Sequence, residues 1–202
     1  MKVAVFSTKR YDRAALERWN AEHQHDLEFF EVPLRPRTAA LAAGYEGVVI
    51  FVNDVANRAA LEQLARGGTR IITTRSSGIN QIDLRAAAEL GIVVARVPAY
   101  SPNAISEFTV GLILTLGRQI HRAYNRVREN NFELQGLEGF EIRDQTIGVF
   151  GTGKIGAATI KNLSGFGPRI LAYDVYRNAE VEDLVTYYDE QLNVMRRSII
   201  LT

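Results

Sequence analysis

The sequence predicts an α/β protein in two units, over residues 1–100 and 101–202, each built on a parallel sheet covered by helices. Short runs rich in Val and Ile alternate with helical patterns along most of the chain. These runs are almost continuously apolar, which indicates strands buried on both faces, as in parallel sheets. The stretch Tyr100-Ser101-Pro102 interrupts the first alternation, and a second alternation starts after Asp144.

The elements of the first unit follow one another through short connections. We expect strands at residues 2–7, 27–32, 47–52, 70–74 and 92–97. Helical patterns between them cover residues 12–21, 38–43, 57–66 and 83–90. Asp83 is a good N-cap for the last of these helices, and Gly91 ends it. This alternation predicts a sheet with helices on both sides.

The second unit is predicted to begin with one long crossover helix, from Pro102 to about Asn131. Ser101 can cap this helix, and Pro102 suits its first turn because a missing N–H costs nothing there. The first half of the helix is apolar and belongs either to the domain core or to a subunit interface. The second half carries several arginines, which we interpret as a solvated face.

The rest of the second unit repeats the strand and helix pattern. Strands are expected at residues 145–150 and 169–173, with a helix at 154–163 between them. The tail predicts a short helix from Val181, a turn at 187–189, a helix at 191–197 and the start of a strand at 198–201. Because a compact domain rarely stops inside a buried parallel strand, we expect the sequence to be C-terminally truncated.

Composition excludes several classes of protein. The 24 basic side chains nearly balance the 23 acidic ones, so nucleic acid and anionic membranes are not expected partners. The sequence has no cysteine, which rules out disulfides and thiolate metal sites and fits a reducing compartment. Residues 1–10 lack the apolar segment of a signal peptide, and the most apolar helical stretch, residues 110–116, is too short to cross a bilayer. We expect a soluble cytoplasmic protein with no metal.

The sharpest motif is Gly151-Thr152-Gly153-Lys154-Ile155-Gly156, between a strand and a helix. In this context the motif is typical of dinucleotide binding. Gly151 permits the tight turn, Gly153 lets the backbone approach a diphosphate, and Gly156 lets the helix pack close to the strand. The diphosphate then faces the free N–H groups at the start of the helix, near Lys154 and Ile155.

Asp174 ends the next predicted strand, where an acidic residue binds the adenosine ribose. Its charge repels a 2′-phosphate, so the sequence favours NAD as the cofactor over NADP. Arg177, three residues on, keeps NADP open. The simplest alternative is a glycine turn that binds nothing.

Further stretches, read together with this motif, resemble the D-2-hydroxy-acid dehydrogenase family, in particular its D-lactate dehydrogenase branch. They are residues 75–83 (RSSGINQID), 97–107 (VPAYSPNAISE), 118–128 (RQIHRAYNRVR) and 165–167 (GFG). The resemblance runs over essentially the whole chain. It implies a flavodoxin-like substrate domain over residues 1–100, followed by an incomplete doubly wound (Rossmann) NAD-binding domain over 101–202.

The resemblance also implies roles for residues outside the glycine motif. Backbone N–H groups at Ser77 and Gly78 would hold the substrate carboxylate, and a glycine there lets the main chain approach an anion. Tyr100 would line the substrate side of the cleft, although a hinge aromatic that only fills space is the alternative. Ile105 would pack near the nicotinamide.

Catalysis in the family, by the same resemblance, needs an arginine that clamps the substrate, a histidine that exchanges the proton and a glutamate that raises the pKa of the histidine. All three are expected beyond Thr202, so we expect no catalytic residue in this chain and no turnover by it alone. His23, His25 and His121 match none of these positions, and we expect them on the surface.

Three hypotheses follow. The first is a truncated NAD-dependent D-lactate-type dehydrogenase, which when intact transfers hydride between NADH and pyruvate or a similar 2-oxo acid and forms a homodimer through the 102–131 helix. The second is a non-enzymatic module of the same fold that binds NAD or dimerises. The third is an inactive remnant whose strand at residues 169–173 leaves an exposed, aggregation-prone edge.

Overall fold

The computed structural model describes residues 1–202, apart from the side chain of residue 201. The chain divides into two compact units, Met1–Tyr100 and Ser101–Thr202. Both are α/β units with parallel sheets, so the predicted fold class is confirmed. Each unit is described below by itself.

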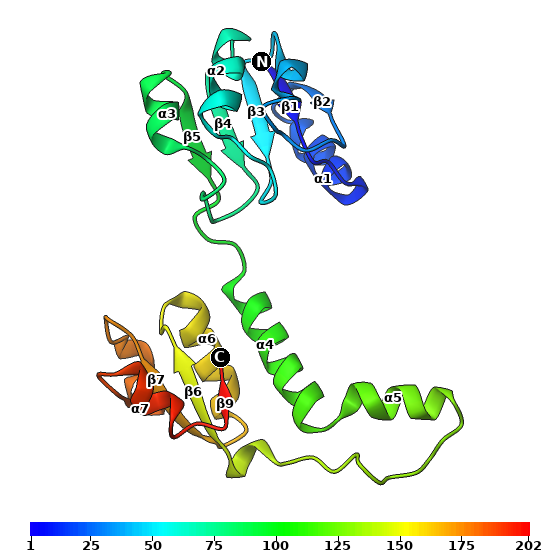
Figure 1. The fold of residues 1–202 in the computed structure, drawn as a ribbon, viewed down its shortest axis with the longest axis vertical. Helices are drawn as coiled ribbons and strands as arrows, with labels where there is room; N and C mark the ends of the chain where they lie inside the picture. Colours follow the sequence, from blue (N-terminus) through cyan, green and yellow to red (C-terminus); the bar gives the residue numbers. More distant parts are fainter. The chain divides into compact units, whose positions relative to one another are not determined.

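The first unit is a parallel sheet with the strand order β2-β1-β3-β4-β5 (Figure 1). This order is that of flavodoxin-like folds. The strands are β1 (Lys2–Val5), β2 (Asp26–Phe29), β3 (Gly47–Ile50), β4 (Ile71–Thr74) and β5 (Val93–Arg96). The helices are α1 (Arg10–Asn20), the 3₁₀ turn η1 (Ala39–Ala42), α2 (Arg58–Arg66) and α3 (Leu84–Glu89). Asp83 caps α3, as predicted, by accepting the N–H of Ala86 at 2.9 Å.

The core of the first unit follows from strand alternation, because successive side chains point to opposite faces. Phe6, Val48 and Ile72 lie on one face, in a buried cluster with helix residues that include Leu61 and Leu64. Val3, Val5 and Val49 lie on the other face, against Leu16 of α1 and neighbouring apolar side chains. Parallel strands bring all their carboxyl ends to one edge of the sheet, where polar loops are free to form a site.

The second unit is a parallel sheet with the strand order β8-β7-β6-β9. Its strands are β6 (Thr146–Phe150), β7 (Arg169–Tyr173), β8 (Thr186–Tyr187) and β9 (Ile200–Leu201). Its helical elements are α4 (Pro102–Gly117), α5 (Ile120–Arg128), η2 (Ile142–Asp144), α6 (Lys154–Ser164), η3 (Ala179–Leu184) and α7 (Gln191–Met195). A polar contact ties α4 to α6, because the buried hydroxyl of Ser106 accepts a hydrogen bond from Asn162 Nδ2 at 2.8 Å.

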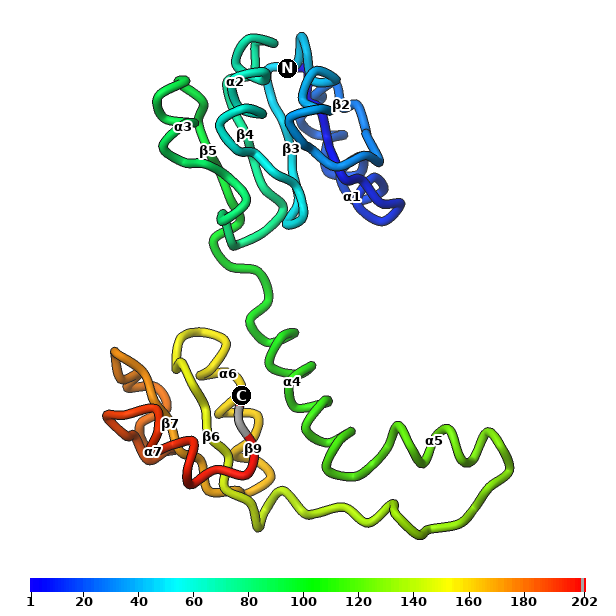
Figure 2. The backbone as a smooth tube through the Cα atoms, viewed as in Figure 1, coloured from blue at the N-terminus to red at the C-terminus, as the bar shows by residue number. Residues whose placement is uncertain are grey.

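The predicted single helix from Pro102 to Asn131 is wrong. The chain turns between α4 and α5, as Figure 2 shows, and Gln119 adopts a left-handed φ of 55° there. The cause lies further along the chain. The N–H of Phe140 donates to the carbonyl of Gly117 at 3.0 Å, and the Phe140 ring covers the place where a Gly117 Cβ would stand. That carbonyl therefore pairs outside the helix, and α4 ends.

The tail also differs from expectation. Residues 187–189 were predicted as a turn, whereas Thr186–Tyr187 forms β8 and pairs with β7, Thr186 opposite Leu171. The strand at 169–173 is therefore paired on both sides, with β6 and β8, and is not the exposed edge that the third hypothesis requires. The helix α7 ends at Met195, and β9 begins at Ile200.

Candidate functional site

The glycine motif forms the turn between β6 and α6. Gly151 has a φ of +89°, which is the left-handed region that only glycine adopts readily. Its N–H donates to the carbonyl of Tyr173 at 2.8 Å, which joins the carboxyl ends of β6 and β7. Gly153 is the N-cap of α6, and a Cβ added there would meet nothing within 4 Å. This side of the turn is therefore open to a ligand.

Asp174 holds the turn from the end of β7. One carboxylate oxygen, Oδ2, accepts the N–H of Thr152 at 2.5 Å and the Thr152 hydroxyl at 3.2 Å. The other, Oδ1, accepts the N–H of Tyr176 at 3.1 Å. These donors hold the pKa of Asp174 below its ordinary value, because they stabilise the ionised form, and the Thr152 N–H has the largest effect. Asp174 is thus a charged group fixed at the glycine turn.

This hydrogen bond explains why residue 156 is glycine. In a trans peptide the C=O and the following N–H point in opposite directions. Because the N–H of Thr152 points to Asp174, the carbonyl of Gly151 points the other way, toward the first turn of α6. A Cβ on Gly156 would collide with that carbonyl oxygen. The sequence predicts that Gly156 lets the helix pack closely. In the structure, the group that lies this close to Gly156 is the Gly151 carbonyl of the turn.

A cavity of about 380 Å³ lies beside the turn. The predicted cofactor residues that line it are Gly151, Gly153, Lys154, Ile155 and Gly156. The first N–H groups of a helix have no partner within the helix, so the start of α6 supplies donors here. The structure thus brings five of the predicted cofactor residues to one cavity, and Asp174 to the turn that borders it.

Ile105, also predicted to contact the cofactor, is not among the residues that line this cavity. It lies on α4 and is partly exposed, and its carbonyl accepts a hydrogen bond from the Thr109 hydroxyl at 2.9 Å. Thr109, one helical turn further on, lines the cavity. Sequence reasoning missed Thr109, although a spacing of four residues on a predicted helix would have placed it on the same face.

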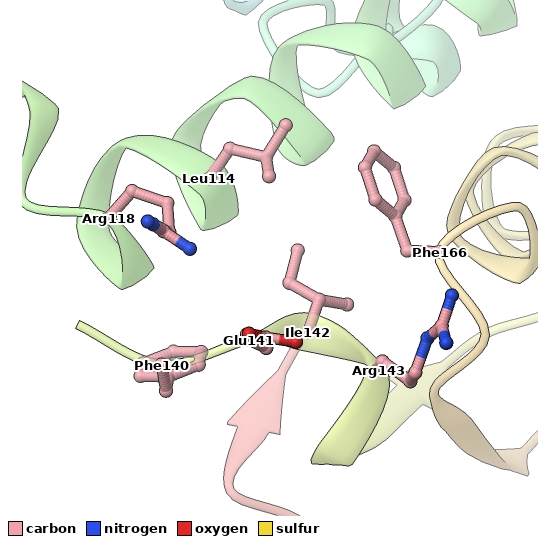
Figure 3. Close-up of a pocket in the computed structure, with 7 residues that line it drawn as sticks. All are labelled: Leu114, Arg118, Phe140, Glu141, Ile142, Arg143 and Phe166. Atoms are coloured by element: carbon pink, nitrogen blue, oxygen red, sulfur yellow. The ribbon is translucent and has the colours of Figure 1, made fainter.

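A second cavity of the same unit, of about 500 Å³, lies at the other end of β6. It borders η2, which precedes β6, whereas the glycine turn follows β6. Figure 3 shows Leu114 of α4 and Arg118, which directly follows α4, facing Phe166 and Arg143 across it. This cavity is separate from the glycine turn.

The predicted substrate loop follows β4 in the first unit. The carbonyl groups of Ser76, Ser77 and Gly78 are all hydrogen-bonded. The carbonyl of Ser76 accepts the N–H of Val97 at 3.3 Å, that of Ser77 accepts from Arg96 Nη1 at 2.8 Å, and that of Gly78 accepts from the Ser76 hydroxyl at 2.8 Å. Since the Ser76 and Ser77 carbonyls are held by these partners, the N–H groups of Ser77 and Gly78, which share their peptides, point the opposite way. A Cβ on Gly78 would meet nothing within 4 Å, so the approach to these donors is open.

Arg75 anchors this loop and was missed by sequence reasoning. Its guanidinium forms an ion pair with Asp12 at 2.9 Å and donates to the carbonyl of Phe6 at 2.8 Å. It also lies over the ring of Phe51, 5.0 Å from the centroid. Both members of the ion pair are largely buried. An arginine directly after a buried strand was the available signal.

Tyr100 and the histidines complete the predicted set. Tyr100 is the last residue of the first unit, and its side chain is exposed. His23 and His25 are exposed and stack on each other with ring centroids 6.2 Å apart, and His121 is exposed on α5. The expectation that the histidines lie on the surface is confirmed. Within the described part of the chain, no group of His, Asp and Glu side chains is arranged to hold a metal ion.

Among the helices of the described residues, none combines the length and the apolar character that a bilayer crossing requires.

Comparison with known proteins gives consistent matches. The model of the D-isomer specific 2-hydroxyacid dehydrogenase catalytic domain matches residues 3–198. A 2-hydroxyacid dehydrogenase homolog of Haemophilus influenzae is 52% identical over 202 residues, which are 100% of this chain and 61% of that protein. The chain thus spans about 61% of the length of this relative.

Solved structures match along the whole chain as well. The apo-structure of D-lactate dehydrogenase from Escherichia coli is 46% identical with a TM-score of 0.92, and the match covers 100% of this chain and 64% of that one. The structure of D-lactate dehydrogenase with NAD+ from Lactobacillus jensenii is 30% identical with a TM-score of 0.76, over 100% of this chain and 61% of that one.

Proposed function

The chain belongs to the D-isomer specific 2-hydroxyacid dehydrogenase family, and from that premise we propose that it carries the substrate loop and the NAD-binding turn of a D-lactate-type dehydrogenase. The observation that carries the proposal is the Thr152 N–H held by Asp174 within a glycine turn that opens a helix. The relative from Lactobacillus jensenii, whose structure contains NAD+, supports the choice of cofactor.

The residues of the second unit fit NAD. Gly151 and Gly153 leave the turn open, the start of α6 offers N–H donors to a diphosphate, and Asp174 offers a charged acceptor to ribose hydroxyls. Bound NADH would supply a hydride to the carbonyl carbon of pyruvate or a similar 2-oxo acid. Lys154 and Ile155 line the cavity beside the turn, and we propose that Ile105 packs near the nicotinamide.

The charge of Asp174 favours NAD over NADP, because a 2′-phosphate would approach an ionised carboxylate. Arg177 was the residue that kept NADP open. Its guanidinium is paired with Asp189 at 2.8 Å and lies over the Tyr187 ring, 5.5 Å from the centroid. Because Arg177 already pairs with Asp189, it is less available to a 2′-phosphate, which supports NAD.

The substrate proposal rests on the first unit. The N–H groups of Ser77 and Gly78 would receive the carboxylate of a 2-oxo or 2-hydroxy acid, because the carbonyls on either side are engaged with the protein. Arg75 holds this loop against β1. We propose Tyr100 as a further contact on the substrate side.

The groups that act on the substrate carbonyl are proposed to lie outside these 202 residues. The family resemblance implies an arginine, a glutamate and a histidine, and the exposed His23, His25 and His121 do not meet the role. We therefore propose that the chain by itself has no dehydrogenase turnover.

Two measurements on the purified 202-residue chain test these proposals. Titration with NADH, followed by its fluorescence, is expected to show binding that Asp174→Ala removes. Pyruvate-dependent oxidation of NADH is expected to be undetectable. Binding that is indifferent to Asp174 would refute the cofactor site, and measurable oxidation would refute the location of the catalytic groups.

A second candidate function is a dimer-forming module. Exposed apolar side chains gather on α4 and α5: Leu112, Leu116, Ile120, Tyr124 and Val127. Large exposed apolar patches mark interaction surfaces. We propose that a homodimer forms through this two-helix surface, in place of the single 102–131 helix. Size-exclusion chromatography with and without NAD tests it. A dimer that tightens with NAD favours the module, and a monomer in both conditions rejects it.

A further inference from the structure

The side chain of Asn178 holds the glycine turn from a second direction. Its Nδ2 donates to the carbonyl of Thr152 at 2.7 Å, while its Oδ1 accepts the N–H of Glu180 at 3.0 Å at the start of η3. Its own backbone N–H donates to Tyr187 Oη at 3.0 Å. Asn178 is therefore fixed on both sides, and it joins the segment after β7 to the turn after β6.

Thr152 is buried, and two residues of the segment after β7 bind it. Asp174 accepts hydrogen bonds from the N–H and the hydroxyl of Thr152, and Asn178 donates one to its carbonyl. Because the peptide between Thr152 and Gly153 is trans, a carbonyl that points to Asn178 sends the N–H of Gly153 the opposite way. Asn178 thus sets the direction of a donor in a residue that lines the cavity.

That direction matters for an anion. Backbone N–H groups attract a diphosphate, and a carbonyl oxygen turned toward it would repel it. Without a hold on Thr152, the peptide before Gly153 would be free to rotate, because glycine tolerates a wide range of φ. A turn of this kind therefore needs an external hold on the Thr152 carbonyl.

We propose that Asn178 is a positioning residue for dinucleotide binding, which locks the Thr152–Gly153 peptide with its N–H toward the diphosphate. The inference rests on the proposed function, since the ligand is the NAD of that site. Asn178 does not touch the ligand in this role. It acts through Thr152, as Asp174 does in part.

The alternative role of Asn178 is only to cap η3. That role uses Oδ1, whereas the hydrogen bond to Thr152 uses Nδ2. Two substitutions separate the roles. Asn178→Asp keeps an acceptor for Glu180 and loses the donor. Asn178→Ser keeps an N-cap acceptor without adding a charge, and its hydroxyl is too short to serve Glu180 and the Thr152 carbonyl together. Asn193→Ser is the matched control, because Asn193 is a half-buried amide whose hydrogen bonds go to Glu190 and Arg197.

The test is a set of titrations on the 202-residue chain with NADH, ADP and adenosine as probes. Loss of one neutral hydrogen bond corresponds to a roughly 3- to 10-fold weaker equilibrium. We expect this loss for NADH and ADP in Asn178→Ser and at least as large a loss in Asn178→Asp. Adenosine has no diphosphate, so its affinity should not change, and Asn193→Ser should bind all three probes as the unaltered chain does.

Each other outcome is decisive. Unchanged ADP affinity in Asn178→Ser, while Asp174→Ala loses NADH, overturns the role of Asn178 and leaves the proposed function standing. Equal losses for adenosine and ADP also overturn it, since the effect would not pass through the diphosphate. Failure of the unaltered chain to bind NADH or ADP overturns the proposed function together with this inference. If the variants melt early, the amide proton of Gly153 in the NMR spectrum decides: ADP should shift it less in either variant than in the unaltered chain, and an equal shift rejects the proposal.

Discussion

The carboxylate of Asp174 accepts both the N–H and the hydroxyl of Thr152, at 2.5 and 3.2 Å. Asp174, which directly follows β7, is thereby part of the glycine turn that follows β6. The task that the structure shows, shaping the turn, and the proposed task, facing a ribose, are separable by substitution.

Asp174→Asn is expected to keep the turn and to lose the charge. The amide oxygen can still accept the Thr152 N–H, and only the longer hydrogen bond from the Tyr176 N–H is lost. The neutral amide no longer repels a 2′-phosphate. Removing one unit charge near the surface should raise the affinity for NADPH relative to NADH about tenfold. Fluorescence titrations with both nucleotides measure this ratio. An unchanged ratio would mean that Asp174 does not face the adenosine ribose.

The same residue predicts a pH dependence. The folded pKa of Asp174 lies below its ordinary value of 3.8, with the Thr152 N–H as the main cause. A lowered pKa means that the stabilisation is complete above the unfolded value and is lost as the pH falls through the folded one. The difference in unfolding free energy between the unaltered chain and Asp174→Asn should therefore be constant near neutral pH and shrink below about pH 4. Urea unfolding at a series of pH values measures it, and a difference that grows on acidification contradicts the prediction.

Gly156→Ala is expected to be disruptive, because its Cβ would collide with the Gly151 carbonyl. Overpacking of this kind costs about 1–3 kcal/mol, and the displaced turn should bind NADH more weakly. Gly111→Ala is the matched control. A Cβ on Gly111, within α4, meets nothing within 4 Å, so alanine should stabilise the helix by up to about 1 kcal/mol. Chemical denaturation and NADH titration of both variants provide the comparison, and equal effects at the two sites would refute the close approach.

Arg75→Met is expected to destabilise the first unit. Removing one partner of a buried ion pair leaves Asp12 uncompensated, at a cost of about 3 kcal/mol. Arg85→Met is the control, because the pair between Arg85 and Glu89 is exposed and should contribute little to stability. Unfolding monitored by circular dichroism measures both. A loss for Arg75→Met no larger than that of the control would show that the pair with Asp12 is not effectively buried.

The sequence predicts well those structural features that depend on residues close by in the chain. The turn at Gly151, the cap at Asp83 and the strand at 169–173 each depend on residues close by, and the structure agrees with them. The strand β8 was missed because two residues carry no periodic pattern, and it exists through its pairing with β7.

Two of the residues that sequence reasoning missed, Arg75 and Asn178, depend on distant partners. Arg75 reaches Asp12 and Phe6, and Asn178 reaches Thr152, so only the folded chain shows their roles. The end of α4 has the same origin, since Phe140 closes over Gly117 from another part of the unit.

The break between α4 and α5 gives a prediction about stability. The sign of the stability change in Gln119→Gly distinguishes a broken helix from one continuous helix. Gln119 has a φ of 55°, a conformation that costs a side chain about 1 kcal/mol and costs glycine nothing. Gln119→Gly should therefore leave the protein equally or more stable, by up to about 1 kcal/mol. In one continuous helix the same substitution would destabilise by about 1 kcal/mol, because glycine is a poor helix former. Thermal and urea unfolding of Gln119→Gly and Gln119→Val measure the sign. Since a β-branched residue tolerates a left-handed φ poorly, the valine variant should be the less stable of the two, and the reverse order would restore the single helix.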